Sequence, residues 1–203
     1  MKKPVQLCGV ISQSKLQDKR KDILAAALKL FVEYGFHGTP TSKIAAEAGV
    51  ANGTLFHYYK TKEELVIVLY NDIKNELNSY VISKTSCSAS LETKFKTMFI
   101  HTIYWALDNH EKFYYIHQFH FSPHLAKISP ETIHQQSTCH IRLIDEGIKN
   151  KLLKTMPIEF MFTLISSHVF GLYQYLTNGD FLESEQKNII DDSYDMLWKM
   201  IKP

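Results

Sequence analysis

Residues 39–62 carry short polar, aromatic and basic side chains at a spacing that suits contact with duplex DNA. Asn52, Gly53 and Thr54 are small or short enough to approach base edges in a major groove. His57 and the residues up to 62 add an imidazole, phenolic hydroxyls and ammonium groups, all of which bond phosphate oxygens. The pattern predicts a segment that distinguishes base sequence near residue 52 and holds the DNA backbone near residue 60.

Two short helices must position these side chains. Thr39 as a cap and Pro40 at the first helical position predict one helix, which ends at Gly49. A second helix is expected over about residues 52–58, and Gly49 permits the tight turn between the two. Ala45 is small where they touch, and Val50 and Leu55 anchor the second helix from below. The spacing is that of a helix-turn-helix, although an ordinary helical hairpin would show the same caps.

The remaining chain is also predicted to be helical, so the expected fold is all-α with about nine helices. The first helix should run from about Asp18 to Tyr34 and end at Gly35. Thr61 and Glu64 form a capping box that begins a helix to about residue 83. We expect three parts: a flexible N-terminal arm (1–15), a helix-turn-helix domain (16–62) and a helical body (63–203). Helices of the body are predicted over about residues 91–109, 111–121, 130–150, 157–178 and 184–201.

Charge is distributed unevenly along the chain. Residues 1–64 contain 10 Lys and Arg against 6 Asp and Glu, a net charge of +4, whereas the remainder carries 13 against 15. A basic front on a mildly acidic body indicates that a polyanion binds at the N-terminal end. The 45% hydrophobic content excludes a disordered chain. Apolar stretches far shorter than about 20 residues, together with few scattered cysteines, predict a cytoplasmic protein.

The sequence contains none of the common catalytic motifs that were sought. Nucleophile-elbow, phosphate-loop, zinc-protease and dinucleotide-binding patterns are all missing from the sequence, so we expect neither an enzyme nor a cofactor. His117, His120 and His124 have the spacing of metal ligands on one helical face, but Pro123 interrupts it, and no metal site is predicted. A metal-responsive regulator that uses C-terminal histidines remains an alternative, as does a structural DNA-binding protein without an effector.

Residues 18–65 resemble the N-terminal domain of the TetR (tetracycline-repressor) family of bacterial transcriptional regulators. The matching segments are Leu30-Phe31, Tyr34-Gly35-Phe36, Thr39, Ile44-Ala45, Ala48-Gly49-Val50 and the run from Gly53 to Leu65. The resemblance covers about a quarter of the chain, and the rest is similar only as a helical body of suitable length. Phe56 departs from the tyrosine that many members carry, and Ala51 from a small polar residue, which affects which operator sequence is bound.

The resemblance implies a DNA-contacting role for residues at matching positions. Early residues of the first short helix would touch phosphates or base edges, and those at the start of the second would face bases. Later residues would hold phosphates, and Phe56 would offer apolar contact to a thymine methyl group. The implied DNA-binding set is Thr41, Ser42, Asn52, Gly53, Thr54, Phe56, His57, Tyr58 and Lys62.

The resemblance also implies a repressor that binds its operator as a homodimer and is released from it by a small, largely apolar effector. Symmetric dimers contact two half-sites, whereas a helix-turn-helix monomer contacts too little DNA. The expected dimer residues are Phe160, Leu164, Ser167, His168, Gly171, Tyr175, Tyr194 and Leu197. The expected effector-binding residues are Phe99, Trp105, Tyr115, His117, Gln118 and Phe121. They come from an aromatic-rich stretch that could equally form an ordinary hydrophobic core.

Overall fold

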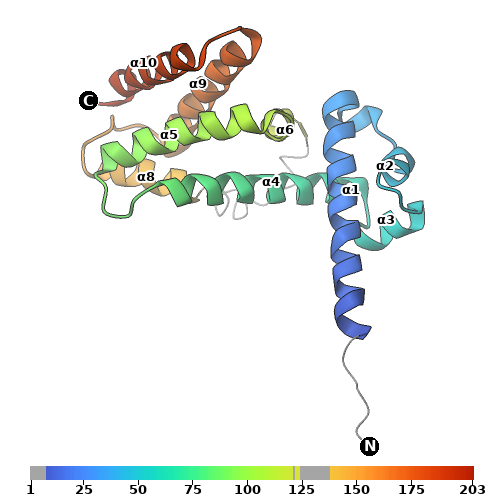
Figure 1. Ribbon diagram of the computed structural model, residues 1–203. Coiled ribbons are helices and arrows are strands. Elements are labelled where there is room, and N and C mark those ends of the chain that lie inside the picture. The colour runs from blue at the N-terminus through green and yellow to red at the C-terminus, as the bar shows by residue number, and fades with distance from the viewer. Residues whose placement is uncertain (1–7, 121, 124–137) are drawn as a thin grey trace, which may run out of the picture. The chain divides into compact units, whose positions relative to one another are not determined.

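The structure, a computed structural model, describes residues 8–120, 122–123 and 138–203. Within these ranges the protein forms nine helices and no strand (Figure 1), which confirms the all-α prediction. None of the helices described there is long and apolar enough to cross a membrane. The helices are α1 (Cys8–Gly38), α2 (Thr41–Glu47), α3 (Asn52–Tyr58), α4 (Lys62–Lys84), α5 (Leu91–Asp108), α6 (His110–His120), α8 (Thr138–Lys149), α9 (Ile158–Asn178) and α10 (Glu183–Ile201).

The chain divides into two compact units, whose boundary differs from the expected one at residue 62. The described part of the first unit comprises residues 8–71, 114–120 and 122–123, and that of the second comprises 72–113 and 138–203. Helices α4 and α6 therefore each contribute residues to both units. Local sequence signals could not reveal this division, because a continuous helix shows no break where its neighbours change.

The first unit is built on α1, which buries one face along its length. Ile23, Ala27, Leu30 and Phe31 are at most 2% exposed, as their 3.6-residue spacing predicts. The helix begins at Cys8 rather than near residue 18, so residues 8–15 are helical and not a flexible arm, and residues 1–7 lie outside the described range. Gly35 interrupts it with φ 72°, which glycine adopts at little cost.

Thr39 links the end of α1 to the start of α2, and does so differently from the expected cap. Pro40, and not Thr39, occupies the N-cap position of α2. The Thr39 side chain is fully buried, and its hydroxyl lies 3.0 Å from the Leu30 carbonyl oxygen and 2.8 Å from that of Gly35. The hydroxyl donates to these backbone carbonyls, so the buried Thr39 side chain is attached to the last turns of α1.

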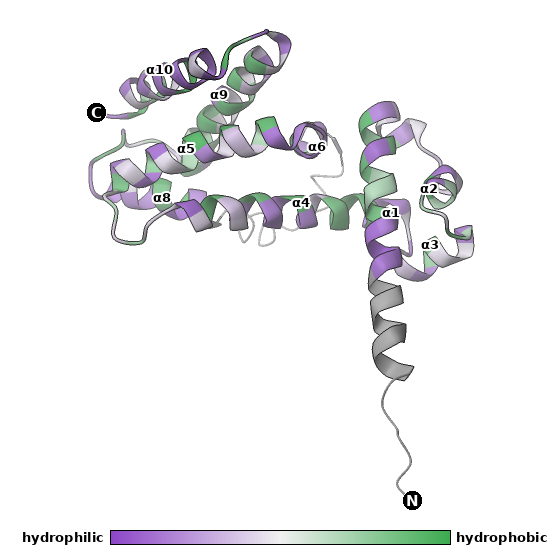
Figure 2. Cartoon of the chain, viewed as in Figure 1, coloured by the Kyte–Doolittle hydropathy of each residue, from purple (hydrophilic) through white to green (hydrophobic). Residues whose placement is uncertain are grey.

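The second unit has its core among α5, α8, α9 and α10. Helix α5 packs against the other three, and α9 also packs against α8 and α10. Aromatic rings fill this core: the Phe95 and Trp198 centroids are 5.7 Å apart, and those of Phe99 and Tyr194 are 5.6 Å apart. Figure 2 colours α9 largely as hydrophobic and α10 largely as hydrophilic, which is consistent with a more central α9.

Tyr115 is the largest of the fully buried side chains and belongs to the first unit. Its hydroxyl donates a hydrogen bond of 2.9 Å to the Val66 carbonyl oxygen in α4. Its ring stacks on Phe31 and meets Phe36 edge to face, with centroids 6.2 and 5.5 Å apart. Burial raises the pKa of the Tyr115 hydroxyl well above its ordinary value, so this group stays a neutral donor. The C-terminal half of α6 is thereby attached to α1 and α4.

Replacing Tyr115 with Phe should lower the free energy of unfolding by about 0.5–1.5 kcal/mol, the usual net contribution of one buried hydrogen bond. Urea unfolding followed by circular dichroism measures this change. Tyr114→Phe is the matched control, because the neighbouring tyrosine is 40% exposed and should change stability by less than about 0.5 kcal/mol. Equal effects of the two substitutions would contradict a stabilising role for the Tyr115 hydrogen bond.

Candidate nucleic-acid interface

The turn between α2 and α3 has the backbone geometry of a helix-turn-helix. Gly49 has φ +65°, a left-handed conformation that side chains with a Cβ rarely adopt. The Gly49 N–H donates to the Ala46 carbonyl at 3.1 Å and the Val50 N–H to the Ala45 carbonyl at 2.9 Å. These bonds satisfy the last carbonyls of α2 and reverse the chain. The predicted role of Gly49 is therefore confirmed.

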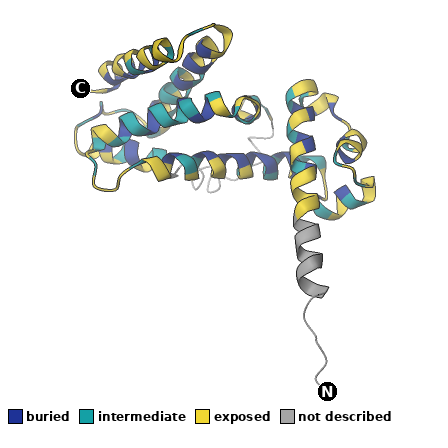
Figure 3. Ribbon diagram, in the orientation of Figure 1, coloured by how far each residue is buried: buried dark blue, intermediate teal, exposed yellow. Residues whose placement is uncertain are grey.

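Each of the two short helices buries one side and exposes the other. Ile44, Ala45 and Leu55 are at most 2% exposed, and they attach α2 and α3 to the core of the first unit. Figure 3 shows buried and exposed residues within both helices. On the outward side, Ser42, Asn52, Gly53, Phe56 and His57 are exposed, whereas Thr41, Thr54, Tyr58 and Lys62 are half-buried.

Gly53 has open space around it in the protein. A Cβ atom built at this position would have no other atom within 4 Å, and the backbone has no positive φ. Nothing inside the chain therefore requires glycine here. A close approach by another molecule is a physical reason for a residue without a side chain at the start of α3.

The start of α4 is held by a variant of the predicted capping box: Thr61 caps as expected, but the Glu64 carboxylate accepts from the N–H of Lys60 and not from that of Thr61. The Glu64 N–H donates to the Thr61 hydroxyl oxygen at 3.0 Å, and the Lys60 N–H donates to a Glu64 carboxylate oxygen at 2.6 Å. This pair of bonds sets the direction in which Lys62 leaves the helix. Partial burial lowers the pKa of the Lys62 ammonium, and the Glu63 carboxylate opposes that change.

Two further lysines of the first unit have partners within the protein. The Lys29 ammonium lies 2.6 Å from a Glu47 carboxylate oxygen, and this ion pair joins α1 to α2. The Lys43 ammonium lies 3.4 Å from the centre of the Tyr34 ring, a cation–π contact. Sequence reasoning did not foresee these pairings, because their partners lie on a different helix or across the break at Gly35.

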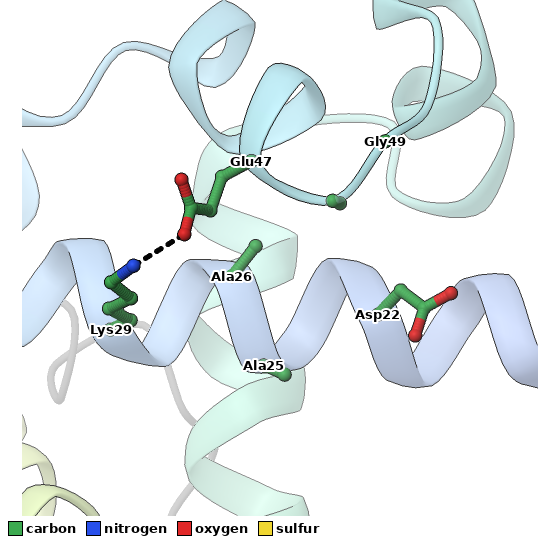
Figure 4. Close-up of a pocket in the computed structure, with 7 residues that line it drawn as sticks. Asp22, Ala25, Ala26, Lys29, Glu47 and Gly49 are labelled. Carbon is green, nitrogen blue, oxygen red and sulfur yellow. Dashed lines mark hydrogen bonds and ion pairs between the residues drawn. The ribbon is translucent and has the colours of Figure 1, made fainter.

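A hollow of about 460 Å³ lies between α1 and the end of α2 (Figure 4). Its wall contains none of the residues expected to bind an effector. It is lined by Asp22, Ala25, Ala26, Lys29, Glu47, Ala48 and Gly49. In Figure 4 Glu47 lies opposite Lys29, whereas Gly49 is displaced toward Asp22 and hence toward the N-terminal side of α1.

The expected effector residues are divided between the two compact units. Phe99 and Trp105, which are 5% and 3% exposed, belong to the second unit. Tyr115, His117 and Gln118 belong to the first unit. The Tyr115 hydroxyl is already bonded to Val66, while the buried Gln118 Oε1 has no hydrogen-bond partner among the described residues. The sixth residue, Phe121, lies outside the described ranges.

Histidines supply no cluster of metal ligands in the part of the chain that the structure describes. Residue 124, the third histidine of the predicted spacing, falls outside that part. Burial and the neighbouring His120 lower the pKa of His117.

In the second unit, burial and the Lys74 ammonium lower the pKa of His140 to about 3, so this imidazole is neutral. Lys74 is 8% exposed and was missed by sequence reasoning, although its spacing from Tyr70 and Leu77 is that of a core residue.

The expected dimer residues divide into two groups. Phe160 and Tyr175 are 51% and 57% exposed, Ser167 and Gly171 are exposed, and Leu164 and His168 are half-buried. The His168 Nε2 lies 2.8 Å from the Ser193 hydroxyl. Tyr194 and Leu197 are only 4% and 2% exposed, so their expected place on the dimer surface was wrong. They pack inside the chain, and the exposed apolar residues of α10 are instead Met196 and Met200.

Comparison with known proteins agrees with this geometry. Residues 23–69 match the model of the family described as bacterial regulatory proteins, tetR family. The fatty acid metabolism regulator protein of Bacillus subtilis (strain 168) is 43% identical over 54 residues. That match covers 27% of this chain and 28% of the relative, so it spans little more than a quarter of either protein.

Similarity to solved structures extends over most of the chain. A putative tetR family transcription regulator from Shewanella sp. PV-4 aligns with a TM-score of 0.82 and 29% identity, over 90% of this chain and 97% of the other. AibR, solved in complex with isovaleryl coenzyme A and operator DNA, has the same fold, with a TM-score of 0.69 and 18% identity over 89% and 98% of the two chains. The helix-turn-helix segment, residues 23–69, is therefore of the type found in bacterial regulatory proteins of the tetR family, and the chain shares the helical architecture of solved regulators of that family.

Proposed function

We propose that this protein is a transcription regulator that binds an operator as a homodimer and is released from it by a small, largely apolar effector. The observation that carries the DNA-binding part is the outward side of α3. Asn52, Gly53 and His57 are exposed there, on a helix attached to the core by the fully buried Leu55. A firmly held helix with small polar residues at its start suits insertion into a major groove.

Different residues of this surface have different proposed roles. Asn52 and Gly53 are proposed to lie at base edges. The Asn52 amide can accept a hydrogen bond from adenine N6 and donate one to adenine N7, and Gly53 permits close approach. Thr41, Ser42, Thr54, His57, Tyr58 and Lys62 hold backbone phosphates, while Phe56, 38% exposed, contacts a thymine methyl group. Phosphate contacts contribute affinity for any duplex, and base contacts contribute the preference for one sequence.

Replacing Lys62 with Ala should weaken binding to every duplex alike and reduce the salt dependence of binding by about one unit per protomer. Replacing Asn52 with Ala should instead change sequence preference, by about 1–3 kcal/mol at the affected base pair. The measurement is a gel-shift titration at several salt concentrations, with duplexes selected from a random library by the unaltered protein. Lys84→Ala, the same charge change at the other end of α4, is the control. Unchanged operator affinity in both test variants would show that the proposed docking is wrong.

The homodimer is proposed to form through the outward sides of α9 and α10. Exposed Phe160, Tyr175, Met196 and Met200 are large apolar side chains whose burial against a second copy would be favourable. Gly171 lies on the same side of α9, and no atom lies within 4 Å of a Cβ built there. Small residues at such positions allow two helices to pack closely.

Replacing Gly171 with Trp should separate the paired helices and give a monomer in light scattering. Because Gly171 is exposed and a Cβ built there meets no atom within 4 Å, the protomer should keep its helical circular dichroism. Ser88→Trp places the same ring in the exposed loop before α5, and this control variant should stay dimeric. A folded Gly171→Trp dimer of undiminished affinity would mean that the interface lies elsewhere.

The effector is proposed to bind among the helices of residues 91–150, near Phe99 and Trp105. Support comes from the aromatic side chains of this segment and from two similar proteins: the fatty acid metabolism regulator, by its name, and AibR, which was solved with isovaleryl coenzyme A. The effector must bind more tightly to a conformer in which the two α3 helices of the dimer do not fit the operator. A coupling of about 1.4 kcal/mol changes operator affinity tenfold. We propose that α4, which contributes to both units, transmits the change.

Medium-chain fatty acids and their coenzyme A thioesters are the first ligands to test. In a Trp198→Phe variant, Trp105 is the one remaining tryptophan, so a true effector should alter its emission. The same ligand should raise the unfolding temperature and lower operator affinity over one concentration range. Ligands that stabilise the protein without ever changing operator affinity would argue against release by an effector.

A further inference from the structure

One charged side chain is buried among the apolar residues of α4. Lys74 is 8% exposed, and it is the only buried charged residue in the part of the chain that the structure describes. Leu77 and Val81, one and two turns later in α4, are at most 3% exposed, so Lys74 lies on the core face of the helix. An ammonium taken out of water is costly unless an anion or hydrogen-bond acceptors meet it. Hydrophobic packing therefore does not explain a lysine at this position.

The surroundings of Lys74 in the second unit include α8 and α9. Burial and the Lys74 ammonium lower the pKa of His140 in α8 to about 3, and such an influence requires the two side chains to lie near each other. The neutral imidazole adds no charge of its own and offers an N–H as a donor. Its ring centroid is 6.4 Å from that of Phe162 in α9. A cation, a neutral hydrogen-bonding group and an aromatic ring thus occur together.

The same group of helices contains the proposed effector site. Helix α8 packs against both α5 and α9, and α5 includes Phe99 and Trp105, which are buried. The Phe99 ring centroid is 5.9 Å from that of His168 in α9. Ring contacts therefore join α9 to α5 at Phe99 and to α8 at His140. The apolar side chains expected at the effector and the Lys74 cation belong to one helical assembly.

We propose that Lys74, beside His140, binds the carboxylate of the effector, a small molecule with an apolar chain. This inference rests on the proposed effector site and specifies the charge of its ligand. An ammonium has three N–H donors, so Lys74 can keep partners within the chain and still bind an incoming carboxylate. A hydrogen bond between charged groups is about twice as strong as one between neutral groups, and a site of low dielectric strengthens it further.

The burial of Lys74 favours a free carboxylate over a coenzyme A thioester. The thioester carbonyl is neutral, and the anionic groups of coenzyme A are phosphates on a large polar nucleotide. Bringing that nucleotide to an ammonium that is 8% exposed would remove many polar groups from water. A primary alcohol of equal chain length has the same apolar part and no charge. Carboxylate, alcohol and thioester of one chain length therefore distinguish the alternatives.

The first experiment titrates the unaltered protein with medium-chain carboxylates, the primary alcohols of equal length and the corresponding coenzyme A thioesters, by calorimetry. The carboxylate that binds best should bind at least about tenfold more tightly than its alcohol, because only the carboxylate pairs with a buried cation. Operator affinity, measured by fluorescence anisotropy in the same buffer, should fall over the concentration range in which this carboxylate binds.

The second experiment compares two variants. Lys74→Met keeps an unbranched stem and removes the charge, so it should bind carboxylate and alcohol with equal affinity. Lys84→Met is the matched control, because it makes the same exchange at an exposed position of α4, and it should keep the tenfold preference. Circular dichroism and the unfolding temperature verify that both variants are folded. The comparison of ligands on the unaltered protein does not depend on either variant.

Equal affinity of the unaltered protein for carboxylate and alcohol would overturn the proposal, and so would a carboxylate preference that survives in Lys74→Met. If an alcohol or a thioester releases the operator while carboxylates do not bind, the carboxylate site is wrong and release by an effector stands. If a carboxylate binds through Lys74 and operator affinity stays constant, the site stands and release by this ligand is wrong.

Discussion

The packing of α2 on α1 and of α3 on α2 is the constraint on which the rest of the structure depends. Each of these helices has only seven residues, which is too short for a stable helix in water. Their stability comes from Ile44, Ala45 and Leu55, which are almost completely buried. Because these three side chains face inward, the opposite side of α3 faces outward. The surface that we propose to contact DNA is thus a consequence of hydrophobic packing.

Polar interactions position the helices that the core stabilises. The Thr39 hydroxyl bonds carbonyls near the break in α1, and the capping box of Thr61 and Glu64 sets the start of α4. The Lys29–Glu47 ion pair is exposed, so water and salt screen it and it contributes little to stability; we regard the pair as orienting α2. The break at Gly35 and the turn at Gly49 depend on positive φ, which favours glycine.

Helices α4 and α6 each contribute residues to both compact units, and the proposed regulation would act through them. In the first unit, Tyr115 of α6 donates to the Val66 carbonyl of α4 while packing on aromatic rings of α1. In the second unit, the Lys74 ammonium of α4 is close enough to influence the pKa of His140 in α8. A conformational change in either helix therefore alters packing that lies within the DNA-binding unit.

The sequence alone determined the features that rest on local physics. Side-chain periodicity predicted the all-α fold, Gly49 and the Thr61–Glu64 box predicted the turn and the start of α4, and the run from residue 39 to 62 identified the helix-turn-helix. The set of exposed residues on α3 followed from the same periodicity, since Leu55 marks the buried face. These features depend on residues within a few positions of each other, so one sequence contains the necessary information.

Only the tertiary structure decided which partner each remaining side chain meets. Tyr194 and Leu197 have the spacing of an interface stripe but pack within their own chain, because α5 and α9 cover that side of α10. Tyr115 was expected at an effector, yet its hydroxyl bonds Val66, 49 residues earlier in the chain. The spacing of apolar residues shows that a helix face is buried, but not which segment covers it. The identity of the covering segment depends on contacts between distant parts of the chain, which no local pattern specifies.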